Sequence, residues 1–231
     1  MKNIPPIQKS GSFLLILILC LVQWQSFAEG TNKVLLPTVT LSTEAVPSGN
    51  IAQGNTGVVY IVKMVSTEAF VLNYVNFKMS GTFTAGNLLA GYLHMGATNN
   101  FASATYVGAG SGVSAIASGG IISAWVGNLN IAANSTNYFF LQIYASSTAT
   151  LGNTIKVNGA DSPNPVTLTS TSTLTIVNNQ SDIAGPLTIS SPSVILSTVA
   201  IPAFNAANGS TNQTVYNTTI QNQYSVMLFN N

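Results

Sequence analysis

The sequence predicts an all-β protein: an antiparallel β-sandwich with Greek-key or jelly-roll connections, followed by a partial second module. Three observations lead to this prediction. Short runs of β-branched and aromatic residues are separated by Gly, Pro, Asn and Ser, which is the pattern of strands and turns. Several runs alternate apolar and hydroxyl side chains, and helical periodicity is hard to find. Finally, residues 37–56 recur as residues 192–211.

Eight strands are expected in the first module. In the first of them, Val39 and Leu41 alternate with threonine and serine, so one face is buried and the other is polar. Around Tyr74 the apolar parity changes, and a β-bulge would account for the change. A barrel is the weaker alternative to a sandwich. The predicted strands span residues 34–43, 58–65, 70–79, 88–95, 121–126, 138–144, 154–157 and 167–177.

The first 28 residues have the pattern of a secretory signal peptide. Lys2 and Lys9 make a positive start, residues 13–22 are apolar, and Ser26 and Ala28 are small residues at the cleavage positions. The expected organisation is a signal peptide over 1–28, a β-sandwich module over 29–188 and an incomplete repeat of that module over 189–231. We therefore expect a secreted protein that is extracellular or held at the cell surface.

The chain is unusually poor in charge. Only 5% of its residues are charged, there is no arginine, and the lysines are scattered. Ordinary soluble domains carry roughly 25% charged residues. Scattered lysines predict neither nucleic acid nor, after signal cleavage, a membrane as partner. A nearly uncharged surface also does not repel copies of itself. The only cysteine, Cys20, lies within the signal peptide, so the mature chain is expected to have no disulfide.

Groups suited to catalysis are scarce. His94 is the one histidine, no G-x-S-x-G motif occurs, and we interpret His94 as a residue of a polar face or loop edge. Asp161 stands among turn formers and is expected in a turn. The stretch Gly108 to Gly112 contains no lysine and is expected to be a flexible loop, not a phosphate loop. We expect no enzymatic activity, no cofactor and no metal site.

Aromatic residues in the strand over 138–144 could stack on sugars. Alternation favours instead the packing of Phe139 into the core together with Leu141 and Ile143. The aromatic residues in question are Tyr138, Phe139, Phe140 and Tyr144.

Part of the first module resembles a known group of proteins. The run from Val46 to Thr56, residues 80–83, the strand around Phe139 and residues 151–155 resemble the repeated β-sandwich modules of large secreted surface proteins of Bacteroidota. The similarity covers roughly residues 35–180 and rests on turn spacing and composition. It implies an extracellular adhesive or structural role with modules in tandem. The chain departs from that pattern because it has one whole module, part of a second, and no recognisable C-terminal sorting domain.

The C-terminal segment is expected to be an assembly element. Leu41 and Gly54 recur as Leu196 and Gly209, and the chain ends before a second copy of the module could be completed. Strands expected over 194–198, 215–220 and 224–229 cannot bury enough surface alone. Donated to a neighbouring subunit, they would extend its sheet, and head-to-tail donation generates filaments. The candidate interface residues are Val194, Leu196, Val215, Tyr216, Tyr224, Val226, Leu228 and Phe229.

The function expected from the sequence is that of a secreted structural subunit of an extracellular filament or surface matrix, assembled head to tail by β-strand exchange. Its partners would be copies of itself, with surface polysaccharide as a further candidate. Two alternatives stay open at this point. One is a fragment of a modular cell-surface adhesin, and the other is a carbohydrate-binding or degradative exoprotein.

Overall fold

A computed structural model of the chain describes residues 36–157, 164–198 and 218–222. The proposed signal peptide lies outside these ranges. In the described part, fourteen strands and two short 3-10 turns follow one another. The strands are β1 (Thr38–Glu44), β2 (Gly49–Ala52), β3 (Thr56–Ser66), β4 (Phe70–Gly81), β5 (Leu88–Gly96), β6 (Thr105–Gly110), β7 (Ile121–Ile131), β8 (Ser135–Ala145), β9 (Thr154–Val157), β10 (Val166–Ser170), β11 (Thr175–Asn179), β12 (Leu187–Ser190), β13 (Val194–Thr198) and β14 (Thr218–Asn222). The turns are η1 (Phe101–Ser103) and η2 (Val113–Ala115).

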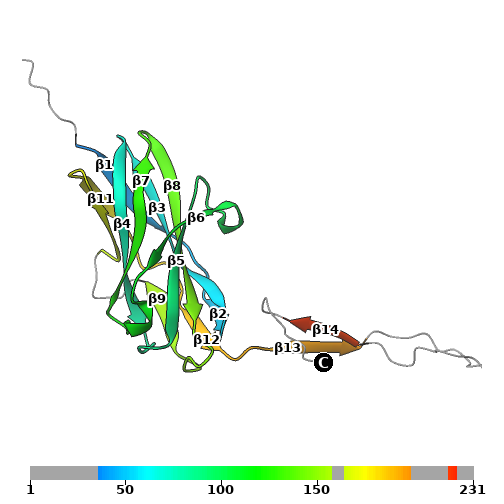
Figure 1. The fold of residues 1–231 in the computed structure, drawn as a ribbon. Coiled ribbons are helices and arrows are strands. Elements are labelled where there is room, and N and C mark those ends of the chain that lie inside the picture. The colour runs from blue at the N-terminus through cyan, green and yellow to red at the C-terminus, as the bar shows by residue number, and fades with distance from the viewer. Residues whose placement is uncertain (1–35, 158–163, 199–217, 223–231) are drawn as a thin grey trace, which may run out of the picture. The chain divides into compact units, whose positions relative to one another are not determined.

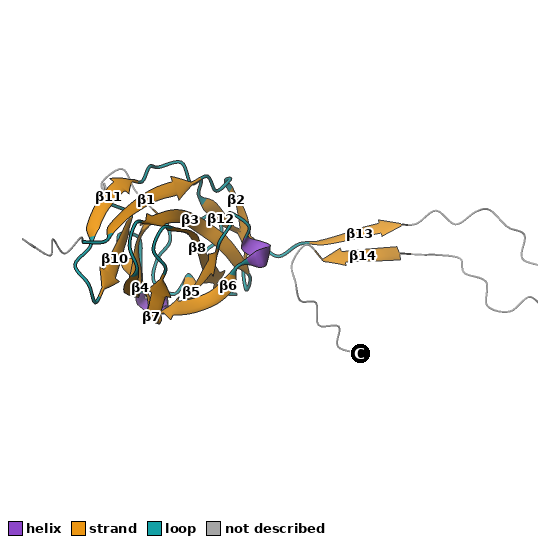
Figure 2. Cartoon of the chain, turned by 90° about the horizontal axis from the view of Figure 1, so that it is seen from above, coloured by secondary structure: helices purple, strands orange, loops and turns teal. Residues whose placement is uncertain are grey.

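The first twelve strands form one curled sheet around the core (Figures 1 and 2). Its order is β11-β1-β3-β8-β5-β6-β7-β4-β9-β12-β2, with β10 also paired to β4. Opposite parts of the curled sheet face each other across the core, so the prediction of an all-β, sandwich-like fold is confirmed. The sheet is mixed, because β1 pairs with β11 and β12 pairs with β2 in parallel. Among the described residues, no helix is long and apolar enough to cross a membrane.

Alternation along the strands sets which side chains enter the core. In β1, Val39 and Leu41 are buried while the residues between them are partly exposed. In β8, Phe139, Leu141 and Ile143 are fully buried, as predicted. The buried residues of the module join one continuous apolar cluster. A period of two residues therefore places one face of each strand in the core.

The β-bulge predicted near Tyr74 is present. The pairing of β4 with β10 runs regularly from Phe77 opposite Val166 to Tyr74 opposite Thr169 and resumes with Leu72 opposite Ser170, so β4 has one extra residue at this point. Beyond the shift, Val75 and Phe77 are buried. The change of apolar parity in the sequence is thus the trace of a bulge that turns the strand over.

The single strand predicted over 167–177 is wrong. The chain forms β10 and β11 instead, because the Ser-Thr-Ser stretch between them turns, with Thr171 donating its N–H to the Val71 carbonyl at 3.3 Å. Three further strands, β2, β6 and β12, were not predicted. Because β12 pairs with β9 and β2 and Ile189 is buried, the first module extends to Ser190, two residues past the predicted boundary.

The flexible loop predicted from Gly108 to Gly112 is also wrong. Gly108 and Gly110 belong to β6, and a Cβ atom on Gly108 would lie 2.1 Å from the Trp125 carbonyl oxygen of β7. The glycine therefore permits a close approach of two backbones. Glycine content predicts a loop here, but these glycines lie in a strand, where the absence of a side chain permits close contact with the neighbouring strand.

β13 and β14 form a second, two-stranded sheet, which repeats the first strand pairing of the module. β13 repeats the sequence of β1, and it pairs antiparallel with β14 as β1 pairs with β3. Leu41 pairs with Met64, 23 positions later, and its counterpart Leu196 pairs with Ile220, 24 positions later. The repeat in sequence is therefore a repeat in strand pairing, with one extra residue in the connection. The strand predicted over 215–220 overlaps β14, and the one predicted over 224–229 lies outside the described residues.

Gly81 at the end of β4 tests how tightly the sheet is packed. Its φ is +123°, and a Cβ atom there would lie 2.2 Å from the Thr154 carbonyl oxygen of β9. We expect Gly81→Ala to lower the free energy of unfolding by about 2 kcal/mol or more, because steric overlap adds to backbone strain. Chemical denaturation measures the change.

Gly86→Ala is the matched control for this substitution. Gly86 has a φ of +85° and nothing within 4 Å of the added Cβ atom. Alanine there should lower the free energy of unfolding by about 1 kcal/mol only, which is the cost of the left-handed backbone conformation. Equal effects of the two substitutions would show that the approach of β4 and β9 is not tight.

Candidate functional site

The end strand β11 presents an open, uncharged edge. All five of its residues are exposed, including Ile176 at 43% and Val177 at 41%. Thr175 donates its N–H to the Pro37 carbonyl of the β1 side at 2.9 Å. In a parallel ladder, alternate residues direct their N–H and C=O groups to opposite edges, so Ile176 directs its groups away from β1. Its backbone N–H and C=O groups therefore face the gap on the other side of β11.

Across this edge lies β10, and we call the gap between β10 and β11 the seam. The two strands are not paired with each other in the sheet. At one end, the Gln180 side chain bridges the gap, since its Oε1 accepts from Val166 N at 3.0 Å and its Nε2 donates to Val166 O at 2.9 Å. A cavity of about 210 Å³ lies along the seam, with Leu168 and Ile176 among its lining residues. The Asn178 side chain, which donates to Asn164 Oδ1, crosses the same gap, so amide side chains substitute for the missing ladder at this end of the seam.

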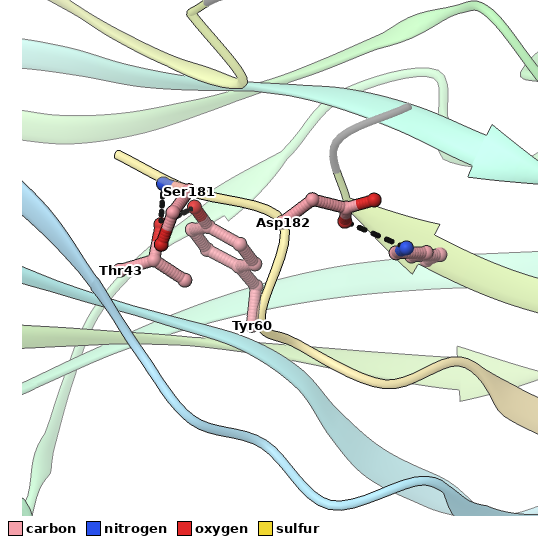
Figure 3. Close-up of polar contacts among 5 residues, drawn as sticks. Thr43, Tyr60, Ser181 and Asp182 are labelled. Atoms are coloured by element: carbon pink, nitrogen blue, oxygen red, sulfur yellow. Dashed lines mark hydrogen bonds and ion pairs between the residues drawn. The ribbon is translucent and has the colours of Figure 1, made fainter. Parts of the chain in front are cut away.

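A buried polar contact anchors the segment that leaves β11 (Figure 3). The Thr43 hydroxyl lies 2.5 Å from the Tyr60 hydroxyl, and Ser181 donates its backbone N–H to Thr43 Oγ1 at 3.0 Å. Next to it, Asp182 forms an ion pair with Lys156 Nζ of β9 at 2.6 Å. These contacts join β1, β3 and β9 to the segment that leads from β11 to β12.

Burial raises the pKa of Tyr60 to about 12. The main cause is the loss of solvent around the phenolate. The Thr43 hydrogen bond lowers the pKa and the negative charge of Asp182 raises it, both by less. Tyr60 also packs edge-on against Phe77 at 6.4 Å between ring centroids. The tyrosine is a structural anchor that stays neutral at any physiological pH.

Only two of the predicted interface residues fall within the described chain. Val194 and Leu196 both belong to β13, where they pair with Asn222 and Ile220. The remaining six lie outside the described residues: Val215, Tyr216, Tyr224, Val226, Leu228 and Phe229.

His94 is held in a neutral environment on the outward side of β5. Its Nε2 lies 3.2 Å from Gln142 Oε1, and its ring packs edge-on against Phe101 and Tyr106 at 5.0 and 5.9 Å between centroids. No group of three His, Cys, Asp or Glu side chains that could hold a metal ion occurs in the described ranges. Asp161 lies outside those ranges. The surroundings of His94 offer hydrogen bonding and ring packing.

The aromatic residues of β8 are not an exposed platform. Phe139 is buried in the core as predicted, and Phe140 is also fully buried, on the opposite side of the strand. Phe101 of η1 lies over Phe140 at 5.7 Å between centroids. The large aromatic residues that are exposed in the described ranges come from other strands, and no sequence pattern marks them as a group: Tyr74 at 39%, Tyr106 at 59% and Trp125 at 58% exposed. The change of apolar alternation at Tyr74 is the one sequence feature that indicates an outward-facing aromatic residue.

The sequence matches no family model and no curated protein. Among solved structures, it is similar to a chain of the CaDoc0917–CaCohA2 complex, a cohesin–dockerin pair, with 16% identity over 66% of this chain and all of that one, at a TM-score of 0.32. It is also similar to the GH20 exo-β-N-acetylglucosaminidase of Vibrio harveyi, with 10% identity and a TM-score of 0.20 over 71% of this chain. The match spans 20% of the enzyme chain. Similarities this low transfer no function.

The Tyr60 anchor predicts a specific loss of stability in alkali. A folded-state pKa of about 12, above the usual value of 10.0, means that the neutral phenol stabilises the fold below pH 10 and that this contribution is lost as the pH rises toward 12. We expect the wild type to lose more free energy of unfolding between pH 9 and 11.5 than Tyr60→Phe does. Urea denaturation at both pH values measures the difference.

The same pair of proteins tests the hydrogen bond at neutral pH. Removing the phenol hydroxyl leaves Thr43 with the Ser181 N–H alone, so Tyr60→Phe should cost about 1 kcal/mol at pH 7. Parallel losses in alkali for wild type and Tyr60→Phe would show that another group dominates the alkaline transition.

Proposed function

We propose that this chain is a non-catalytic, secreted structural subunit of an extracellular filament or surface matrix, and that it assembles head to tail by β-strand exchange. The observation that carries the proposal is the open edge of β11, which is exposed along its whole length and has no charged residue. The apolar segment near the N-terminus and the absence of cysteine beyond it support secretion.

Natural sheets usually protect such an edge with lysine, proline, a bulge or a covering segment. β11 has the sequence Thr-Ile-Val-Asn-Asn, which contains neither lysine nor proline. The seam is bridged by Gln180 at Val166, whereas Leu168 and Ile176 line its cavity. Addition of a strand there would provide partners for the backbone groups of Ile176.

The strand proposed to add to this edge is β13 of a neighbouring subunit. β13 repeats β1, and β1 already pairs in parallel with β11, with Val39 opposite Ile176. Val194 is the counterpart of Val39 in the repeat. β11 therefore accepts this strand sequence on one edge within the module, and the proposal has the repeated copy add to the other edge between molecules.

Contact of β13 with β11 of another copy joins two different surfaces. Such a heterologous interface continues indefinitely unless its rotation closes a ring, so it produces filaments. The low charge of the chain fits this outcome, because little electrostatic repulsion opposes close approach of identical subunits. Main-chain hydrogen bonds would provide affinity, and the apolar residues of both strands would provide register.

Ile176→Pro tests strand addition directly. Proline removes the N–H that points away from β1 and leaves the β1 ladder in place, as prolines do on edge strands. We expect the purified secreted wild type to form species of at least ten subunits and Ile176→Pro to remain a monomer. Light scattering coupled to size-exclusion chromatography measures the mass, and electron microscopy detects fibres.

Two further variants make this test specific. Ile176→Ala keeps the backbone donor and should assemble like the wild type. Deletion of residues 194–231, which leaves β12 intact, should abolish assembly by removing the donor strand. A monomeric wild type, or fibres formed equally by Ile176→Pro, would contradict the proposal.

A further inference from the structure

We propose that the outward face of β4, β5, β6 and β7 binds a neutral polysaccharide through a row of aromatic side chains. This inference is independent of assembly, because the residues lie on the face of the sheet and not at its edge. The aromatic row consists of Tyr92, Trp125 and Tyr74, with Tyr106 beside it.

The strand register places the row on one face. Tyr92 is opposite Ala109, Ala109 is opposite Trp125, and Trp125 is opposite Tyr74. Directly opposed residues of antiparallel strands project to the same side of the sheet. Trp125 is 58% and Tyr74 39% exposed, so the row faces solvent.

The small side chain of Ala109 leaves a hollow in the row. A cavity of about 250 Å³ lies there, with Tyr106, Ala109 and Trp125 among its lining residues. Tyr106 stands beside Tyr92 with 6.4 Å between ring centroids, and it is 59% exposed. Tyr92 and Trp125 are two strand spacings apart, roughly 10 Å. Rings at such a separation can contact successive sugar units of an extended glycan.

The chemistry of the face selects the class of ligand. β5, β6 and β7 contain no Lys, Arg, Asp or Glu, and the one charged residue of β4, Lys78, stands opposite Ile121, four residues along the strand from Tyr74. Aromatic rings pack against the C–H face of a pyranose, and their polar tips and nearby amides bond its hydroxyls. Asn73 and Asn128, hydrogen-bonded to each other on the exposed surface beside Tyr74 and Trp125, provide such amides. An uncharged, partly apolar and partly hydroxylated partner fits this face best.

The probes are four neutral polysaccharides: amorphous cellulose and chitin in pull-down assays, and glucomannan and xyloglucan in affinity electrophoresis. Alginate serves as the anionic comparison. We expect the wild type to bind at least one neutral probe better than alginate. Trp125→Ala and Tyr106→Ala should each weaken that binding at least tenfold, since each removes an exposed stacking surface without opening the core.

Tyr138→Ala is the matched control. Tyr138 is a partly exposed tyrosine on the outward side of β8, four residues along the strand from Gln142, which is opposite Tyr92. This variant should bind within twofold of the wild type, and thermal melting should confirm that all three variants fold. The inference is wrong if the wild type binds none of the neutral probes, or if Trp125→Ala binds them as well as the wild type does. It is also wrong if Trp125→Ala changes the mass of the assembly and leaves polysaccharide binding unaltered, because the face would then be a protein interface.

Discussion

The main-chain ladder of the curled sheet does not close between β10 and β11, and the proposed assembly depends on that break. Each strand has a partner on its other side, β4 for β10 and β1 for β11. At the seam, backbone groups rely on water or on side chains, as Val166 relies on the Gln180 amide. The rest of the sheet encloses the core, and under the proposed function the edge of β11 at this break would be able to pair. A fully closed ladder would have removed that capacity.

The same strand sequence appears on both sides of the proposed contact. β1 is paired to β11 within the module, and β13 repeats β1 and begins a second copy of the β1–β3 pairing. The proposed assembly would therefore use a strand sequence that β11 already pairs with, added to its other edge. The anchor of Thr43, Tyr60 and Ser181 matters here, because it fixes the chain between β11 and β12 and thereby the route toward β13.

Edge and face offer two kinds of interaction that do not compete. Strand addition uses backbone groups in the plane of the sheet, whereas the row containing Tyr74 and Trp125 projects perpendicular to it. The scarcity of charge serves both, since it lowers repulsion between subunits and leaves the aromatic face suited to neutral partners. The two proposals thus assign strand exchange and polysaccharide binding to separate surfaces.

The strand class, much of the core and the bulge could be predicted from the sequence, because these features depend on local alternation: Val39, Phe139 and the parity change at Tyr74 are visible directly. The sequence also determined that β13 repeats β1. Local patterns do not reveal that residues 167–177 form two strands, that Gly108 lies against Trp125, or that Phe140 is covered by Phe101. The open edge of β11 and the aromatic row depend on which strands become neighbours, and strand order is set by contacts between residues far apart in sequence, which no local pattern encodes.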